Sequence, residues 1–318
     1  ITVLEGIREE AGDDVRILYS QGCDLYKDKV ENLAWDQDRI SEAVITAENS
    51  DVVILCVGLD ETLEGEEGDT GNSDASGDKV DLHLPKVQEE LIEKVTAVGK
   101  PTIVVLMAGS AIDLNYAQDN CNGILLAWYP GARGGRAVAD LLFGKESPSG
   151  KLPVTFYKDL EGMPEFTDYS MKNRTYRYME KEALYPFGYG LTYSDTCVTE
   201  AEVVSEVSAE SDIMLKATVK NNGTVDTDEV VQVYIKDLDS PLAVRNYSLC
   251  GFKRVSLKAG EEKTVEFTIS NKAMNIVDED GNRYIAGKHF RLFAGVSQPD
   301  TRSAELTGHK PAEVEIAL

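Results

Sequence analysis

Carboxyl side chains crowd one stretch of the chain, which runs from Gly58 to Pro85 and reads GLDETLEGEEGDTGNSDASGDKVDLHLP. Glu64, Glu66 and Glu67 stand closest together within it. A carboxyl that serves as a general acid must keep its proton near neutral pH, and repulsion from neighbouring carboxylates or burial raises its pKa in that direction. The stretch is therefore a candidate for acid/base chemistry. The alternative is that these side chains form a solvated acidic surface loop.

The elements on either side would position this acidic stretch. The apolar run Asp51–Val57 before it predicts a buried strand, and the apolar residues of Lys86–Val98 after it recur at the spacing of one helix face. Open α/β sheets build their sites at the carboxyl ends of strands, which is where the stretch begins. A loop this long is uncommon inside a compact domain, and such loops are usually either functional or disordered.

Strands and helices alternate through the first half of the chain. The strands are continuously apolar, as in parallel sheets that are covered by helices on both faces. Strand candidates are 15–19, 51–57, 102–107 and 123–128, and helix candidates are 39–48, 86–98, 111–118 and 136–143. We therefore predict an α/β domain with a mostly parallel sheet over residues 1–157.

The pattern changes in the second half of the chain. Residues 158–197 are irregular and rich in aromatic side chains, and we expect a linker whose aromatics pack beneath it. Short segments with partial apolar and polar alternation follow, separated by turn signals such as 221–223 and 259–261. This pattern is typical of an antiparallel β-sandwich, which we predict for residues 198–318.

The charge balance excludes several classes of partner. The 318 residues include 32 Lys and Arg against 56 Asp and Glu, which gives a formal net charge of −24. Such a charge argues against binding to nucleic acid or to an anionic membrane, and it favours a neutral or cationic ligand. No apolar run approaches the roughly 18 residues of a membrane span, and Ile1 does not begin a signal peptide.

No cofactor or metal is predicted. The five cysteines and three histidines are scattered, and no CxxC or Cys/His spacing indicates a zinc site. Residues 131–135 follow a strand and open a helix, but they lack the spacing of a dinucleotide loop. Residues 69–81 lack the order of ligands in an EF-hand. The odd cysteine count and the apolar surroundings favour reduced thiols, and hence a cytoplasmic protein.

Several motifs resemble the C-terminal half of the family 3 glycoside hydrolases. They are residues 134–144 (GGRAVADLLFG), 148–156 (PSGKLPVTF) and 185–193 (YPFGYGLTY), together with 59–67 and 78–85 of the acidic stretch. The motifs occur in the family's order, and the resemblance runs from Val3 to about Val296. It implies that residues 1–157 form the family's α/β sandwich domain, N-terminally incomplete, and that residues 198–318 form its fibronectin type III-like domain.

The resemblance also implies an activity and a site. The family hydrolyses terminal β-linked sugars with retention of configuration, so we expect β-glucosidase activity first and β-xylosidase activity next. Matching the family's Gly-Glu pair to Gly65 and Glu66 implies that Glu66 is the general acid/base. Glu64 and Glu67 are the runners-up, which would tune its pKa or bind sugar hydroxyls. Lys79 stands where the family usually has Arg. Substrate-binding residues are not identified, because the family's subsites lie largely on another domain.

That other domain is a (β/α)8 barrel, which carries the family's nucleophilic aspartate, and no barrel is visible in this sequence. We therefore expect the chain to be part of a longer or split enzyme. It would supply the acid/base, a missing barrel domain or subunit would supply the nucleophile, and the chain alone would be inactive. The substrate would be a β-linked glycoside, and a homo-oligomer is compatible with the sequence. The alternative is a non-catalytic module that binds a carbohydrate or a partner protein.

Overall fold

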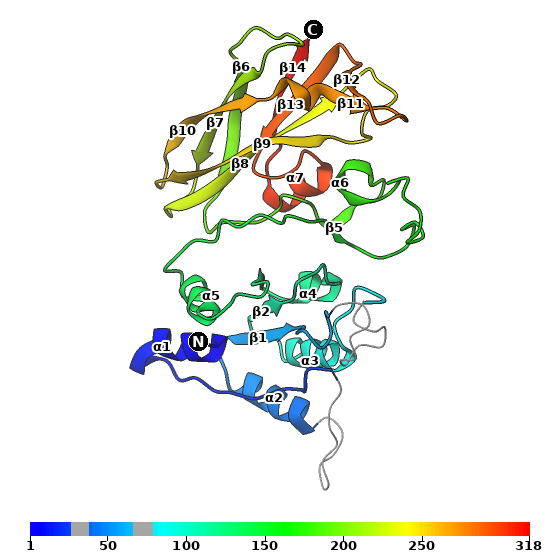
Figure 1. The fold of residues 1–318 in the computed structure, drawn as a ribbon. Coiled ribbons are helices and arrows are strands. Elements are labelled where there is room, and N and C mark those ends of the chain that lie inside the picture. The colour runs from blue at the N-terminus through cyan, green and yellow to red at the C-terminus, as the bar shows by residue number, and fades with distance from the viewer. Residues whose placement is uncertain (27–37, 66–78) are drawn as a thin grey trace. The chain divides into compact units, whose positions relative to one another are not determined.

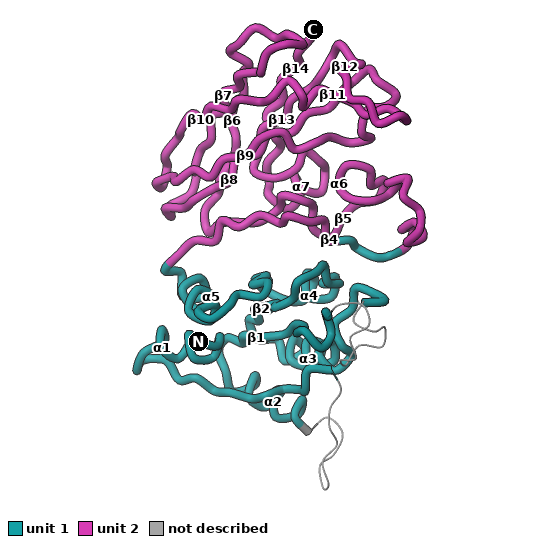
Figure 2. Tube along the Cα trace, viewed as in Figure 1, with its two compact units in different colours: residues 1–145, 157–160 teal, residues 146–156, 161–318 magenta. Residues whose placement is uncertain are grey.

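A computed structural model describes residues 1–26, 38–65 and 79–318. The chain divides into two compact units, which Figure 2 colours separately. Unit 1 comprises residues 1–145 and 157–160, and unit 2 comprises residues 146–156 and 161–318. Most of the predicted linker at 158–197 therefore lies within unit 2.

Unit 1 is built on a parallel sheet with the strand order β1-β2-β3 (Figure 1). The strands are β1 Val53–Gly58, β2 Thr102–Met107 and β3 Gly123–Leu126, and β2 pairs in parallel with both neighbours. The helices are α1 Val3–Ala11, α2 Asp38–Glu48, α3 Lys86–Thr96, α4 Asn115–Asn120 and α5 Gly134–Leu142, with a 3-10 turn at Gly12–Asp14. The predicted parallel sheet with accompanying helices is confirmed.

Helices α1 and α5 pack against each other and against the sheet. Val3, Val105 and Val138, which come from α1, β2 and α5, form the buried centre of this contact. Helix α1 begins in a capping box, in which the Thr2 hydroxyl accepts from the Glu5 amide and the Glu5 carboxylate accepts from the Thr2 amide. Helix α3 buries the apolar face that its sequence predicts.

The predicted strand at Val15–Tyr19 is wrong. The described backbone of these residues belongs to no strand. The side chains of Val15 and Tyr19 are 46% and 59% exposed. A strand register is specified where one face is buried, and here no apolar residue is fully buried, so the sequence does not enforce pairing.

Unit 2 is an antiparallel β-sandwich (Figure 1). One sheet has the order β10-β7-β6 and the other has the order β14-β13-β8-β9. The strands are β6 Thr196–Val203, β7 Ile213–Asn221, β8 Thr227–Asp237, β9 Ser248–Leu257, β10 Glu262–Ile269, β13 His289–Gly295 and β14 Ala312–Ala317. Burial alternates strictly along β7, whose inward residues join a core shared with the other strands. The predicted sandwich is confirmed.

Smaller elements complete the described chain. They are the strands β4 Phe156–Tyr157, β5 Ala183–Tyr185, β11 Asn275–Val277 and β12 Arg283–Ile285, the helices α6 Thr175–Tyr178 and α7 Thr301–Thr307, and the 3-10 helix η2 Asn271–Met274. None of the helices in the described parts of the chain combines the length and the apolar character needed to cross a membrane.

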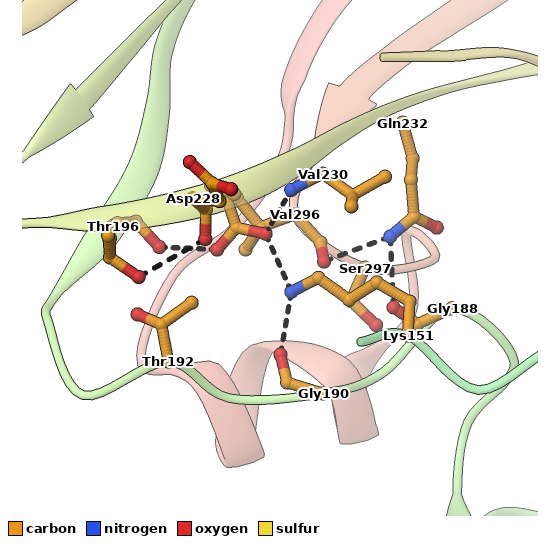
Figure 3. Close-up of polar contacts among 12 residues, drawn as sticks. Lys151, Gly188, Gly190, Thr192, Thr196, Asp228, Val230, Gln232, Val296 and Ser297 are labelled. Atoms are coloured by element: carbon orange, nitrogen blue, oxygen red, sulfur yellow. Dashed lines mark hydrogen bonds and ion pairs between the residues drawn. The ribbon is translucent and has the colours of Figure 1, made fainter. Parts of the chain in front are cut away.

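A buried polar network ties the motif at 185–193 to β8 (Figure 3). Gln232 Nε2 donates to the carbonyl oxygens of Gly188 and Val296, at 2.9 and 3.1 Å, and Gln232 Oε1 accepts from the Tyr234 hydroxyl at 2.6 Å. Gly188 has a φ of 77°, and a Cβ at this position would lie 2.2 Å from Gln232 Oε1. Only glycine tolerates both this left-handed backbone and so close an approach, which explains why the motif has glycine at position 188.

Candidate active site

The acidic stretch begins where β1 ends, and Gly58 is fixed there from two sides. Its amide donates to Gln88 Oε1 and its carbonyl accepts from Gln88 Nε2, both at 2.8 Å. Gln88 lies on α3, is 3% exposed, and also donates to the Leu25 carbonyl at 2.7 Å. A Cβ on Gly58 would lie 1.9 Å from the Met107 carbonyl oxygen, so the end of β1 lies directly against the end of β2.

A compact turn then sets the backbone of Glu64. The Asp60 carboxylate accepts from the amide and the hydroxyl of Thr62, at 2.9 and 2.7 Å. The Asp60 carbonyl accepts from the amides of Leu63 and Glu64, at 3.0 and 2.9 Å. Leu59 and Leu63 are buried, so the turn is held by its apolar side chains as well as by its hydrogen bonds.

The Glu64 carboxylate is held by donors that follow β2 and β3. Oε2 accepts from the Gly109 amide at 2.7 Å and from the Tyr129 hydroxyl, and Oε1 accepts from the Ser110 hydroxyl. Burial by itself would raise the pKa of Glu64, but the hydrogen bonds that it accepts, together with the charge of Lys79, outweigh burial. The pKa of Glu64 is therefore below its ordinary value, and the side chain is an ionised carboxylate at neutral pH.

Lys79 approaches the same segment from the far end of the acidic stretch. Its Nζ donates to Ser110 Oγ at 2.9 Å and to the Ala111 carbonyl at 3.0 Å. Burial lowers the pKa of Lys79, against the opposing charges of Glu64 and Asp81. The residue at the position where the family usually has Arg therefore hydrogen-bonds to the loop after β2.

Tyr129 completes the arrangement from the end of β3. Burial, and then its hydrogen bond to the Glu64 carboxylate, raise the pKa of Tyr129 above its ordinary value, so the phenol stays protonated and donates. The preceding residue, Trp128, has a φ of 52°, an uncommon conformation for a residue with a large side chain. Such backbone strain is concentrated at functional sites.

A cavity of about 530 Å³ opens beside these residues. Its lining comes from residues 21–25, from the end of β1 and the turn that follows, from α3, and from Tyr129 and Pro130. Four acidic residues, Asp24, Asp60, Glu61 and Glu64, are part of this lining. Small-molecule sites commonly measure about 300–1,000 Å³ and combine apolar walls with a few polar groups. The cavity therefore has the size of a small-molecule site and the position of one, at the carboxyl edge of a parallel sheet.

The structure describes some of the predicted site residues and not others. Glu66, the predicted acid/base, and Glu67, a runner-up, lie outside the described residues, as does Asp78. Glu64, the other runner-up, is described, and its ionised and fully hydrogen-bonded carboxylate suits the holding of charge and position rather than proton donation. In the described parts of the chain, no His, Cys, Asp and Glu side chains group in a way that could hold a metal ion.

Sequence reasoning missed Ser110 and Tyr129. A signal for both was present, because each comes just after a predicted strand: Ser110 follows 102–107 by three residues and Tyr129 follows 123–128 directly. The carboxyl ends of parallel strands meet at one edge of the sheet, so polar residues just past those ends converge there. Their shared contact with Glu64 follows from this topology.

Comparison with known proteins identifies the family to which the chain belongs. The profile described as "Glycosyl hydrolase family 3 C-terminal domain" matches residues 1–193, and the profile described as "Fibronectin type III-like domain" matches residues 229–298. A β-xylosidase of Formosa agariphila is 34% identical over 315 residues, covering 96% of this chain and 41% of that protein. A xylan 1,4-β-xylosidase of Xylanibacter ruminicola is 40% identical over 270 residues, covering 84% and 31%.

Solved structures agree with the sequence relatives. A β-glucosidase of Erythrobacter marinus superposes with a TM-score of 0.82 at 31% identity, covering all of this chain and 43% of that one. A Bifidobacterium adolescentis family 3 β-glucosidase gives a TM-score of 0.81 at 28% identity, with 100% and 45% covered. The chain thus spans less than half the length of these proteins. It belongs to glycoside hydrolase family 3, whose C-terminal domain it carries together with a fibronectin type III-like domain.

Proposed function

We propose that this chain is the part of a retaining exo-β-glycosidase that supplies the general acid/base, with Glu66 as the proton donor. The observation that carries the proposal is the cavity at the carboxyl edge of β1, β2 and β3, beside the anchored start of the acidic stretch. The family membership and the hydrolytic relatives support it.

Retaining hydrolysis explains why a second part is needed. It uses an acid/base and a nucleophilic carboxylate about 5–5.5 Å apart, one on each side of the glycosidic bond. We assign the nucleophile to a (β/α)8 barrel domain or subunit, in line with the short span of this chain relative to its relatives. The acid/base would protonate the leaving oxygen and later take a proton from the attacking water.

The proposed substrate is a terminal β-linked glucoside or xyloside. The relatives include a β-xylosidase of Formosa agariphila and a periplasmic β-glucosidase of Salmonella typhimurium, the latter 31% identical over 322 residues. The carboxylates that line the cavity are acceptors suited to sugar hydroxyls. A neutral sugar also agrees with the strongly negative chain, which a phosphorylated or sulfated ligand would not.

The test compares the chain alone with the chain assembled with a family 3 barrel. The isolated chain should not turn over aryl β-glycosides, because half of the carboxylate pair is missing. In the assembled enzyme, Glu66→Gln should lower kcat/KM for substrates with poor leaving groups by about 10²–10⁴ and spare kcat/KM for 2,4-dinitrophenyl glycosides, whose first step needs little acid assistance. The second step, in which water attacks the glycosyl-enzyme, loses its base with every substrate. Glu93→Gln, a change of the same type at an exposed position of α3 that does not line the cavity, is the control. Turnover by the isolated chain, or equal loss on both substrate types, would contradict the assignment.

A non-catalytic carbohydrate-binding module is the second candidate, and the observation that favours it is the cavity of about 530 Å³, whose acidic lining residues could bind sugar hydroxyls without any reaction. Calorimetric titration of the isolated chain with xylobiose and cellobiose distinguishes the two. Tight binding without the barrel, together with no activity in its presence, would support the module.

A further inference from the structure

Ser110 lies between two residues of the acidic stretch that flank Glu66 in the sequence. Glu64 precedes Glu66 and Lys79 follows it, and both hydrogen-bond to the Ser110 hydroxyl. An ammonium group can only donate, so Ser110 Oγ accepts from Lys79 and its own proton is directed to the Glu64 carboxylate. The polarity of this chain of hydrogen bonds is therefore fixed.

The neighbouring backbone strengthens the same connection. The Gly109 amide donates to Glu64 at 2.7 Å, and the Ala111 carbonyl accepts from Lys79 at 3.0 Å. Residues 109–111 thus bind a carboxylate at one end and an ammonium at the other, directly after β2. Hydrogen bonds that involve an ionised group are shorter and roughly twice as strong as neutral ones. Glu64 and Lys79 also attract each other through their charges.

From these contacts we infer that Glu64, Ser110 and Lys79 are positioning residues for the hydrolytic reaction. They tie one residue on each side of Glu66 in the sequence to a single segment at the carboxyl end of β2, and Glu64 stands only two residues before Glu66 in the chain. None of the three is assigned a contact with the reacting atoms. The inference rests on the proposed function, because it needs an acid/base within the stretch.

The geometry is tested first on the chain alone, by hydrogen exchange of backbone amides. In Glu64→Ala the Gly109 amide loses its acceptor and should exchange at least about tenfold faster, because its protection reports that bond. Glu61→Ala, which removes a carboxylate from the same cavity lining, should leave the Gly109 amide unchanged. Equal exchange of this amide in the wild type and Glu64→Ala would overturn the inference.

The role is tested in the enzyme assembled with its barrel, by comparing a 2,4-dinitrophenyl glycoside with a β-linked disaccharide. A misplaced acid slows the disaccharide, which needs protonation of its leaving group, more than the activated aryl substrate. Ser110→Ala and Lys79→Met should reduce kcat/KM for the disaccharide about tenfold and leave kcat/KM for the aryl substrate within about twofold, because kcat/KM reports the step in which the leaving group is protonated. Lys79→Arg keeps the donors and the charge and should restore the rate.

The outcomes separate the inference from the proposed function. A variant that merely lowers the folded fraction loses both activities equally, and equal losses in Ser110→Ala would refute the positioning role. If Glu66→Gln is selective for the disaccharide while Ser110→Ala is not, the inference fails and the proposed function stands. If Ser110→Ala is selective while Glu66→Gln is not, the positioning role stands and the acid/base is a different residue.

Discussion

Lys151 Nζ lies 2.8 Å from Glu229 Oε1 in the interior of unit 2, where the two side chains are 9% and 2% exposed. Lys151 also donates to the Gly190 carbonyl at 2.6 Å, and Glu229 accepts from the Thr196 hydroxyl and the Val230 amide, at 2.5 and 2.6 Å (Figure 3). The pair thus joins two motifs of the chain, PSGKLP and PFGYG, to strand β8. These contacts give the residues of both motifs a structural role within unit 2.

Breaking this pair should be strongly destabilising. Lys151→Met leaves a buried Glu229 carboxylate without its counter-charge, and such a change typically costs about 3–5 kcal/mol. We expect a correspondingly lower urea midpoint for the unfolding of unit 2, followed by circular dichroism. Adding Glu229→Gln should recover part of the loss, because a neutral amide can still accept from Thr196 and Val230.

The matched control is the exposed pair between Lys181 and Glu161, whose side chains are 52% and 85% exposed. Lys181→Met should change stability by less than about 1 kcal/mol, since surface pairs contribute little. Similar losses for Lys151→Met and Lys181→Met would show that burial of the first pair is not decisive.

Gly188→Ala should destabilise unit 2, whereas Gly150→Ala should not. An alanine at 188 must keep a left-handed backbone and place Cβ 2.2 Å from Gln232 Oε1, while a Cβ at Gly150 meets nothing within 4 Å. Backbone strain alone costs about 1 kcal/mol, and displacement of the buried Gln232 amide adds to it. Thermal melts of the two variants beside the wild type provide the comparison, and equal melting temperatures would contradict the prediction.

The contribution of Glu64 to stability should depend on pH. Its folded-state pKa is below the ordinary value, so its contribution is present above the unfolded pKa of about 4.5 and is lost as the pH falls through the folded pKa. At pH 7, Glu64→Gln should cost about 1 kcal/mol, at the low end for bonds to a charged group because the site is partly open to solvent.

The measurement is urea unfolding of the wild type and Glu64→Gln between pH 7 and pH 3. The two free energies of unfolding should converge on acidification. A difference that stays constant over this range would show that the Glu64 charge is not what the Gly109, Ser110 and Tyr129 donors recognise.

The sequence by itself determined the two architectures. Continuously apolar runs such as 102–107 are typical of a sheet covered on both faces, and the partial alternation of 213–219 suits a sheet with one buried face. These patterns are local, since each residue's burial is encoded in its own type and spacing. The exception, Val15–Tyr19, shows the limit of that encoding, because its apolar residues are exposed or only half-buried and form no strand.

Tertiary structure alone decided which groups meet around Glu64 and Glu229. Ser110, Lys79 and Tyr129 are separated from Glu64 by 46, 15 and 65 positions by their numbering, and Lys151 by 78 from Glu229, so no short-range pattern connects them. The parallel sheet brings strand ends to one edge, and the packing of Lys151 and of residues 188–190 on β8 buries two opposite charges together. Pairwise contacts of this kind depend on where distant segments pack, and that follows from the folding of the whole unit.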